Sequence, residues 1–279
     1  MPEYAGTQPG PGSVMLPPVP LETPWTMDIP LLVAHRGYME AYPENSLRGL
    51  AAALQAGAPY VEFDVQSSAD GELLILHDTD LLRTAGRPGQ VLDTAAADLR
   101  GVSVHEPGRF GDRFLPTPIP RLAEIVPLLH HHPDARALVE IKNETLQRFG
   151  RAPVVERLLT AIAPVAGQCH VIGYDREILA AVRERAGMPI GWVIRRYDDQ
   201  ARRQATALDP DLLIGEVSMF PPDRRPWPGP WRWMLFDITD PELALAYAAD
   251  GVELIETRDI GAMYRHPLLA RRRLRSPGE

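Results

Sequence analysis

Short apolar runs alternate with helically periodic segments along most of the chain. The runs recur near positions 32, 62, 139, 171, 192, 213, 235 and 254, and short apolar runs are typical of buried strands. Between them, apolar residues recur every three to four positions, as in Leu122, Ile125, Val126 and Leu129, which predicts helices with one buried face. A helix that follows each strand favours parallel βα units in one α/β domain.

The eight runs predict a closed barrel of eight parallel strands with helices between them, a (β/α)8 or TIM barrel. The first helix is expected to begin near Asn45 or Ser46, either of which could cap it, and to end at Gly57. An open, doubly wound sheet is the alternative architecture. It is less favoured because no G-x-G-x-x-G motif opens a helix in this chain.

A ninth run, Leu73–Leu76, is expected to pair back onto the strand around position 62. The Asp70-Gly71 pair between the two runs predicts a tight hairpin, because these residues tolerate the positive φ angles of such turns. A turn centred on this pair would place His77 directly opposite Asp64. The returning arm must be antiparallel, so it does not count among the eight barrel strands.

Composition divides the chain into an arm, a barrel with one insertion, and a tail. Residues 1–28 are rich in proline and glycine and predict a flexible arm, and residues 29–266 hold the barrel. The stretch of about 79–118 is weakly periodic and reads as an insertion after the second strand. Residues 267–279 are interpreted as a C-terminal tail.

Charge and cysteine content narrow the class of protein. The net charge of −8 argues against a nucleic-acid partner, and the single cysteine, Cys169, rules out an internal disulfide. No apolar run is long enough for a transmembrane helix, and no signal-peptide pattern opens the chain, so no stable membrane insertion and a cytoplasmic location are expected. Nothing in the sequence indicates the oligomeric state.

Charged residues gather where the first three barrel strands are expected to end. The alternation of side chains along a strand places Glu62 and Asp64 on one face, and likewise Glu140 and Lys142. The carboxyl ends of barrel strands meet at one mouth, which is where TIM-barrel enzymes place their active sites. We therefore expect one mouth to contain His35, Arg36, Glu62, Asp64, His77, Glu140 and Lys142.

This set of side chains suits one kind of chemistry. Three carboxylates suit a hard divalent cation, and an arginine with the chain's only lysine suits an anionic substrate such as a phosphate. Two histidines suit proton transfer near neutral pH. Together they predict metal-assisted cleavage of a phosphodiester. A glycosidase also fits a barrel with carboxylates, but it explains the two cations and the second histidine less well.

At these positions the chain resembles the glycerophosphodiester phosphodiesterases. The shared motifs are H-R-G at 35–37, P-E-N-S at 43–46, V-E-F-D-V at 61–65, H-D at 77–78 and V-E-I-K at 139–142, within a resemblance that spans about 31–262. It implies a TIM barrel of the phospholipase C-like type that hydrolyses small glycerophosphodiesters to sn-glycerol 3-phosphate and an alcohol. The implied roles are acid/base catalysis by His35 and His77, Mg²⁺ or Ca²⁺ binding by Glu62, Asp64 and Glu140, phosphate binding by Arg36 and Lys142, and support by Glu44 and Asn45.

Two other functions remain open from the sequence. A catalytically silent barrel would have lost a histidine or a carboxylate of the motif, and none is lost. A lipid-directed phosphodiesterase, of the lysophospholipase D or sphingomyelinase D type, would present an apolar rim, for which Phe220, Trp227 and Trp231 are candidates. Residues 236–239 read F-D-I-T where the family usually has W-T-V-N, so the headgroup preference stays open.

Overall fold

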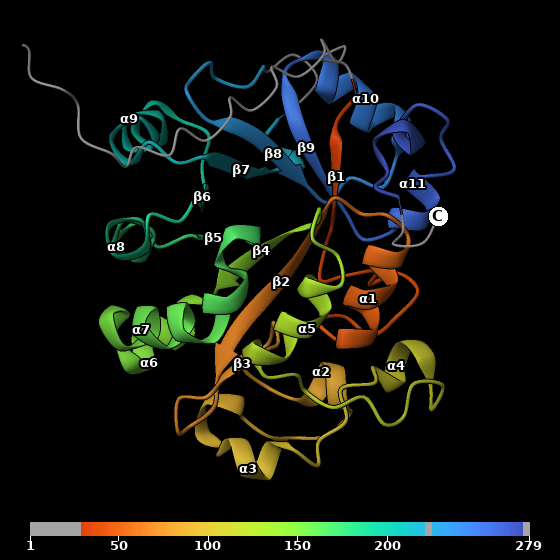
Figure 1. Ribbon diagram of the computed structural model, residues 1–279, viewed down its shortest axis with the longest axis vertical. Coiled ribbons are helices and arrows are strands. Elements are labelled where there is room, and N and C mark those ends of the chain that lie inside the picture. The colour runs from red at the N-terminus through yellow and green to blue at the C-terminus, as the bar shows by residue number, and fades with distance from the viewer. Residues whose placement is uncertain (1–28, 221–224, 276–279) are drawn as a thin grey trace, which may run out of the picture.

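The strands of the computed structural model, which describes residues 29–220 and 225–275, form a closed barrel (Figure 1). Strand β1 (Leu31–Ala34) closes it by pairing in parallel with both β2 (Tyr60–Ser67) and β9 (Val252–Thr257). The other barrel strands are β4 (Arg136–Ile141), β5 (Cys169–Gly173), β6 (Ile190–Val193), β7 (Leu212–Glu216) and β8 (Arg232–Phe236). All eight run parallel, which confirms the predicted TIM barrel.

Helices surround the barrel and bury their apolar faces against the outer side of the strands. They are α1 (Leu47–Gln55), η2 (Leu122–Glu124), α5 (Ile125–His130), α6 (Asn143–Phe149), α7 (Arg151–Ile162), η3 (Ala163–Gln168), α8 (Arg176–Ala186), α9 (Asp199–Leu208), η4 (Val217–Met219), α10 (Pro241–Ala249), α11 (Ile260–Met263) and η5 (Leu269–Arg272). Ser46 caps α1, because its Oγ accepts a hydrogen bond from Gly49 N at 3.0 Å. Leu50 of the same helix is fully buried, and truncating such a leucine to alanine typically costs about 2–5 kcal/mol.

The hairpin is present, but the predicted pairing is shifted by one residue. Strand β3 (Leu73–Ile75) runs antiparallel to β2, with Val65 opposite Ile75, and Leu76 N donates to Asp64 O at 3.0 Å. Asp64 therefore lies opposite Leu76, so the predicted pairing with His77 is wrong. The loop holds three residues, 69–71, closed by a bond from Ser68 N to Glu72 O, whereas the prediction assumed a turn centred between two residues.

The segment after β3 has a small core of its own. It contains α2 (Leu82–Ala85), η1 (Val91–Asp93), α3 (Ala96–Leu99) and α4 (Pro107–Phe110), and Figure 1 shows these helices together beyond β3. Its buried apolar residues form a cluster separate from the main core: Leu74, Leu76, Leu81, Val91, Leu99, Val102, Val104 and Ile119. This packing holds residues 79–118 as a compact unit beside the barrel mouth.

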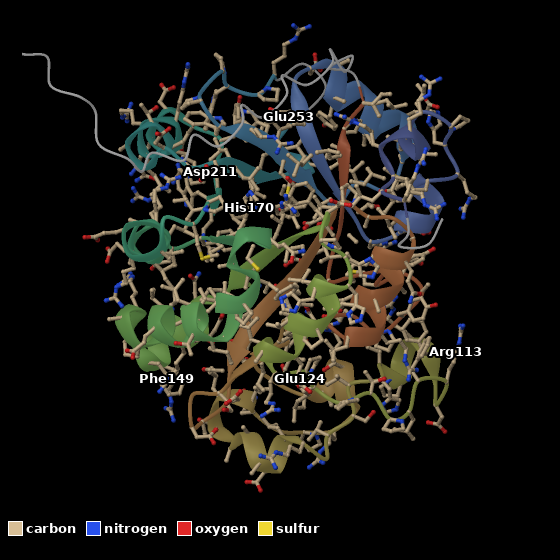
Figure 2. The ribbon with its side chains drawn as sticks, viewed as in Figure 1. Arg113, Glu124, Phe149, His170, Asp211 and Glu253 are labelled. Carbon is tan, nitrogen blue, oxygen red and sulfur yellow. The ribbon has the colours of Figure 1, made fainter. Side chains whose placement is uncertain are left out.

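The barrel interior is layered, and the layers follow the alternation of side chains along the strands. Its middle is apolar, with Val33, Leu138, Ile172, Met234 and Leu254 among the buried residues. At the amino-terminal ends of the strands the interior is polar: His170, near the middle of the ribbon in Figure 2, contacts the ring of Tyr60, and Arg232 Nη1 donates to Tyr60 Oη at 3.4 Å. Two residues further toward the carboxyl end of each strand, the side chains face inward again and line the opposite end of the barrel, its mouth.

Three stretches of the chain lie outside the described residues. They are the predicted arm, residues 1–28, the internal residues 221–224, and residues 276–279 at the end of the predicted tail. Residues 267–275, at the start of the predicted tail, pack against the barrel. Leu269 is fully buried, and Leu274 N donates to Gly57 O at 2.9 Å.

Candidate active site

The first predicted site residues follow β1 in a sharp turn. Arg36 has a φ of 50° and Gly37 a φ of 79°. A Cβ atom at position 37 would lie 2.7 Å from the backbone of Gly49, so the H-R-G motif requires glycine there. The turn aims Arg36 N at the barrel interior, where it donates to Glu62 Oε2 at 2.9 Å.

Three carboxylates meet inside the mouth. Glu62 and Asp64 are each 2% exposed, and one carboxylate oxygen from each of Glu62, Asp64 and Glu140 lies within 4.8 Å of the others. Strands β2 and β4 bring them together because Asp64 lies beside Glu140 in the parallel register. The predicted grouping of these acids on one face is confirmed.

Two cations and one amide hold Asp64 in place. Lys142 Nζ lies 3.0 Å from Asp64 Oδ1 and 3.1 Å from Glu140 Oε1, and Arg36 Nε lies 3.1 Å from Asp64 Oδ2. Asn45 brackets the same carboxylate, donating from Nδ2 to Oδ2 at 2.9 Å and accepting from Asp64 N at 3.1 Å. Asp64 is therefore the best-compensated carboxylate of the cluster.

The electrostatics divide the cluster into two kinds of acid. Burial alone would raise the pKa of Asp64, but Lys142 and Arg36 lower it below its ordinary value. Burial and the neighbouring carboxylates raise the pKa of Glu62 well above its ordinary value, and burial and Asp64 raise the pKa of Glu140. Glu62 Oε1 is buried without a hydrogen-bond partner. An orphaned oxygen among repelling carboxylates is a suitable environment for a divalent cation.

The raised pKa values predict a pH dependence for the metal-free protein. The folded state holds protons on Glu62 and Glu140 at pH values where the unfolded chain, with a glutamate pKa near 4.5, has released them. The free energy of unfolding should therefore fall as pH rises above about 4.5 toward the raised pKa values. Thermal melts in chelator between pH 5 and 8 should show a smaller decline for Glu140→Gln than for wild type. A decline as steep in Glu140→Gln as in wild type would contradict this assignment.

The two histidines have different surroundings. Burial and then Arg36 lower the pKa of His35 to about 3, so its imidazole is neutral near pH 7. Its Nε2 lies 4.0 Å from Glu62 Oε2. His77 lies at the edge of the mouth, with Nδ1 2.7 Å from Asp78 Oδ1. A cavity of about 360 Å³ borders His77, Glu140 and Lys142 and reaches Tyr174 and Arg195.

Comparison with known proteins decides the family. Residues 35–228 match the model of the glycerophosphoryl diester phosphodiesterase family. The chain belongs to this family. A glycerophosphodiester phosphodiesterase of Caldanaerobacter subterraneus subsp. tengcongensis is 32% identical over 132 residues, 47% of this chain and 52% of the relative. The chain thus spans about half the length of the curated relatives that it matches first.

Solved structures share the fold at lower identity. A protein from Silicibacter pomeroyi has a TM-score of 0.73 at 23% identity, covering 87% of this chain and 94% of its own. An Oleispira antarctica phosphodiesterase, solved in complex with the product sn-glycerol-3-phosphate, has a TM-score of 0.73 at 21% identity, covering 85% and 96%. These likenesses support the barrel assignment.

In the described ranges, no helix has the length and apolar character needed to cross a membrane.

Within this family member, Glu44 supports the arginines of the site. Its carboxylate accepts from Arg36 at 2.9 Å and from Arg83 at 2.6 and 2.7 Å. Arg83 also donates to Asp78 Oδ2 at 2.7 Å. This side chain of the insertion therefore links Asp78, which contacts His77, to Glu44, which contacts Arg36. Burial would raise the pKa of Glu44, but these guanidinium groups lower it.

Three residues of this region were not predicted from the sequence. Arg83 and Glu106 come from the aperiodic insertion, and Glu106 accepts from Glu44 N at 2.9 Å. Glu256 lies at the end of β9, 4% exposed, two residues beyond Leu254 of the apolar layer. Its signal was present in the sequence, because it is an acidic residue at the carboxyl end of a barrel strand. Burial and then Glu140 and Asp64 raise the pKa of Glu256 well above its ordinary value.

Proposed function

We propose that the protein hydrolyses small glycerophosphodiesters to sn-glycerol 3-phosphate and an alcohol with the help of a divalent metal ion. The observation that carries this proposal is the convergence of Glu62, Asp64 and Glu140 beside Arg36 and Lys142 at the mouth of a barrel of this family. The sn-glycerol-3-phosphate bound to the Oleispira antarctica phosphodiesterase supports the same product class.

In this proposal, Glu62, Asp64 and Glu140 hold Mg²⁺ or Ca²⁺. When bound, the ion would polarise a phosphoryl oxygen and lower the pKa of a nearby hydroxyl group. Arg36 and Lys142 stabilise negative charge on the phosphoryl oxygens. Glu44 orients Arg36, and Asn45 orients Asp64.

The surroundings of the histidines favour one division of roles. His35 is neutral near pH 7, so it accepts the proton of the nucleophile, either water or the glycerol 2-hydroxyl. The Asp78 carboxylate, 2.7 Å from His77 Nδ1, orients the imidazole at the edge of the mouth, and we assign His77 to donate a proton to the leaving alcohol. The oxygen of the nucleophile bonds to phosphorus while the bond between phosphorus and that alcohol oxygen breaks and the alcohol takes the proton; where the 2-hydroxyl attacks, water then opens the cyclic phosphate to sn-glycerol 3-phosphate.

A substrate panel tests this proposal. The full chain, with Mg²⁺ or Ca²⁺ added, should release sn-glycerol 3-phosphate from glycerophosphocholine, glycerophosphoethanolamine and glycerophosphoglycerol, measured with a coupled dehydrogenase assay. Lysophospholipid micelles and a glycoside panel serve as comparison substrates. Preferential cleavage of the micelles would support the lipid-directed alternative, and no release from any phosphodiester would overturn the proposal.

The lipid-directed alternative requires an apolar rim, but its three candidate residues, Phe220, Trp227 and Trp231, do not form one. Phe220 is fully buried, and Trp231 is 6% exposed. Trp227 stacks on Tyr197 with ring centroids 4.0 Å apart. These rings pack into the protein instead of forming an apolar membrane-facing edge.

Lys142→Arg tests whether the lysine contacts phosphate or only neutralises carboxylates. Arginine keeps the charge, but its planar guanidinium cannot place one compact donor between Asp64 and Glu140. We expect a loss of about 1.5–3 kcal/mol of transition-state stabilisation, or roughly tenfold to a hundredfold in kcat/KM, at saturating metal. The contradicting result is an Arg variant with nearly full activity together with a Lys142→Met variant that only lowers Tm.

A further inference from the structure

Glu256 has no role in the proposed reaction, although it lies inside the mouth. Its side chain follows Leu254 on the inward face of β9, where Glu256 lies beside Val33 of β1. Its Oε1 is buried without a hydrogen-bond partner, and the residue is 4% exposed. A buried carboxylate oxygen without a partner is costly unless a proton or a cation satisfies it.

The neighbours of Glu256 supply the remaining ligands of a cation site. One ligand atom from each of His35, Glu62 and Glu256 lies within 4.8 Å of the others. Glu62 Oε2 accepts from Arg36 N, whereas Glu62 Oε1 is buried and unpartnered. One carboxylate oxygen from each of Glu62 and Glu256 and an imidazole nitrogen of His35 therefore converge near β1 and β9, whereas Asp64 and Glu140 meet Glu62 at the ends of β2 and β4.

We propose that His35, Glu62 and Glu256 form a second divalent-cation site, which shares Glu62 with the first and inhibits the enzyme when filled, because the ion binds the imidazole lone pair of His35. The inhibition rests on the proposed function, whereas the ion site itself does not. A set of one nitrogen and two carboxylates suits Mn²⁺ or Zn²⁺ better than Ca²⁺.

The position of His35 agrees with this role. Its Nε2 lies 4.0 Å from Glu62 Oε2, so an ion held by Glu62 and Glu256 is within reach of the imidazole lone pair. The same lone pair must accept a proton in the proposed reaction. Metal binding and proton acceptance at this nitrogen exclude each other, which is the physical reason for inhibition.

The charge balance sets the order in which the two sites fill. Four inward carboxylates, Glu62, Asp64, Glu140 and Glu256, face the side chains of Arg36 and Lys142, which leaves a formal excess of two negative charges when all are ionised. One divalent ion balances this excess. A second ion close to the first adds uncompensated charge, so it should bind more weakly and only at higher metal concentration.

Titration of the metal-free full chain with Mn²⁺ tests the site, with calorimetry and electron paramagnetic resonance to count bound ions. Wild type should bind two ions, the second more weakly, and Glu256→Gln should bind one. Glu216→Gln is the matched control, because it removes a carboxylate from the end of β7 at the same mouth but outside the cluster, and it should bind two. Glu256→Leu serves as a second variant if the glutamine variant does not fold.

The rate of glycerophosphocholine cleavage provides an independent second measurement. In wild type and Glu216→Gln, the rate should rise and then fall as Mn²⁺ increases. In Glu256→Gln, it should rise and stay high, with inhibition shifted at least tenfold in concentration. One ion per wild-type chain, loss of the tighter ion in Glu256→Gln, or unchanged inhibition would each overturn the second site. Absence of cleavage at every metal concentration would overturn the proposed function, and the ion count would still decide the site.

Discussion

Glu62→Gln is expected to abolish most phosphodiesterase activity while leaving the metal-free protein folded and at least as stable as wild type. Glu62 is buried among Asp64, Glu140 and Glu256, and its pKa is raised by burial and by these carboxylates. A neutral amide of the same shape relieves this repulsion, but it provides a poorer ligand for a hard cation. Since a bound metal contributes several kcal/mol to the transition state, the loss in kcat should be at least about a hundredfold.

Asp64→Asn should lower both activity and stability, unlike Glu62→Gln. It should lose most activity, and its Tm should also fall, because Lys142 and Arg36 would lose the carboxylate that compensates them. Glu140→Gln should resemble Glu62→Gln. The measurements are kcat with added Mg²⁺ or Ca²⁺ and thermal melts in chelator for all three variants. Excess EDTA should reproduce the loss in wild type, and full activity in EDTA would disprove the metal assignment.

The barrel could be predicted from the sequence because its pattern is local and repeated. Each strand is a short apolar run, and alternation along it fixes which side chains face inward, so Leu138 predicts the direction of Glu140 and Lys142. The hairpin register could not be fixed in this way. Asp70-Gly71 is compatible with a two-residue or a three-residue loop, and the difference of one residue moves the partner of Asp64 from His77 to Leu76.

Site residues could be predicted where they lie at the carboxyl ends of barrel strands, and less well elsewhere in the chain. Glu62, Asp64, Glu140 and Lys142 meet as expected because parallel neighbours align their carboxyl ends. Glu256 was missed because the predicted mouth drew its charged residues from the first three barrel strands, whereas Glu256 lies in the last strand, which ends at Thr257. Arg83 was missed for a different reason. Its partner Glu44 is 39 residues away, and only the packing of the insertion brings the two together.

His35→Ala and His77→Ala should each lower kcat by at least about a hundredfold, the usual scale for removing a general acid or base. Neither change should unfold the protein, because both residues lie at the mouth and outside the apolar core of the barrel. The division of roles predicts that the two variants respond differently to the substrate. His77 is assigned to protonate the leaving alcohol, and a leaving group of low pKa departs without that proton.

A glycerophosphodiester with a p-nitrophenyl leaving group should therefore restore much of the rate in His77→Ala and little of it in His35→Ala. Asp78→Asn provides an intermediate case, because it removes the carboxylate 2.7 Å from His77 Nδ1 and keeps the imidazole. It should show a partial loss on glycerophosphocholine and nearly full activity on the p-nitrophenyl substrate. The opposite pattern, with rescue of His35→Ala alone, would exchange the roles of the two histidines, and equal rescue of both would contradict separate acid and base functions.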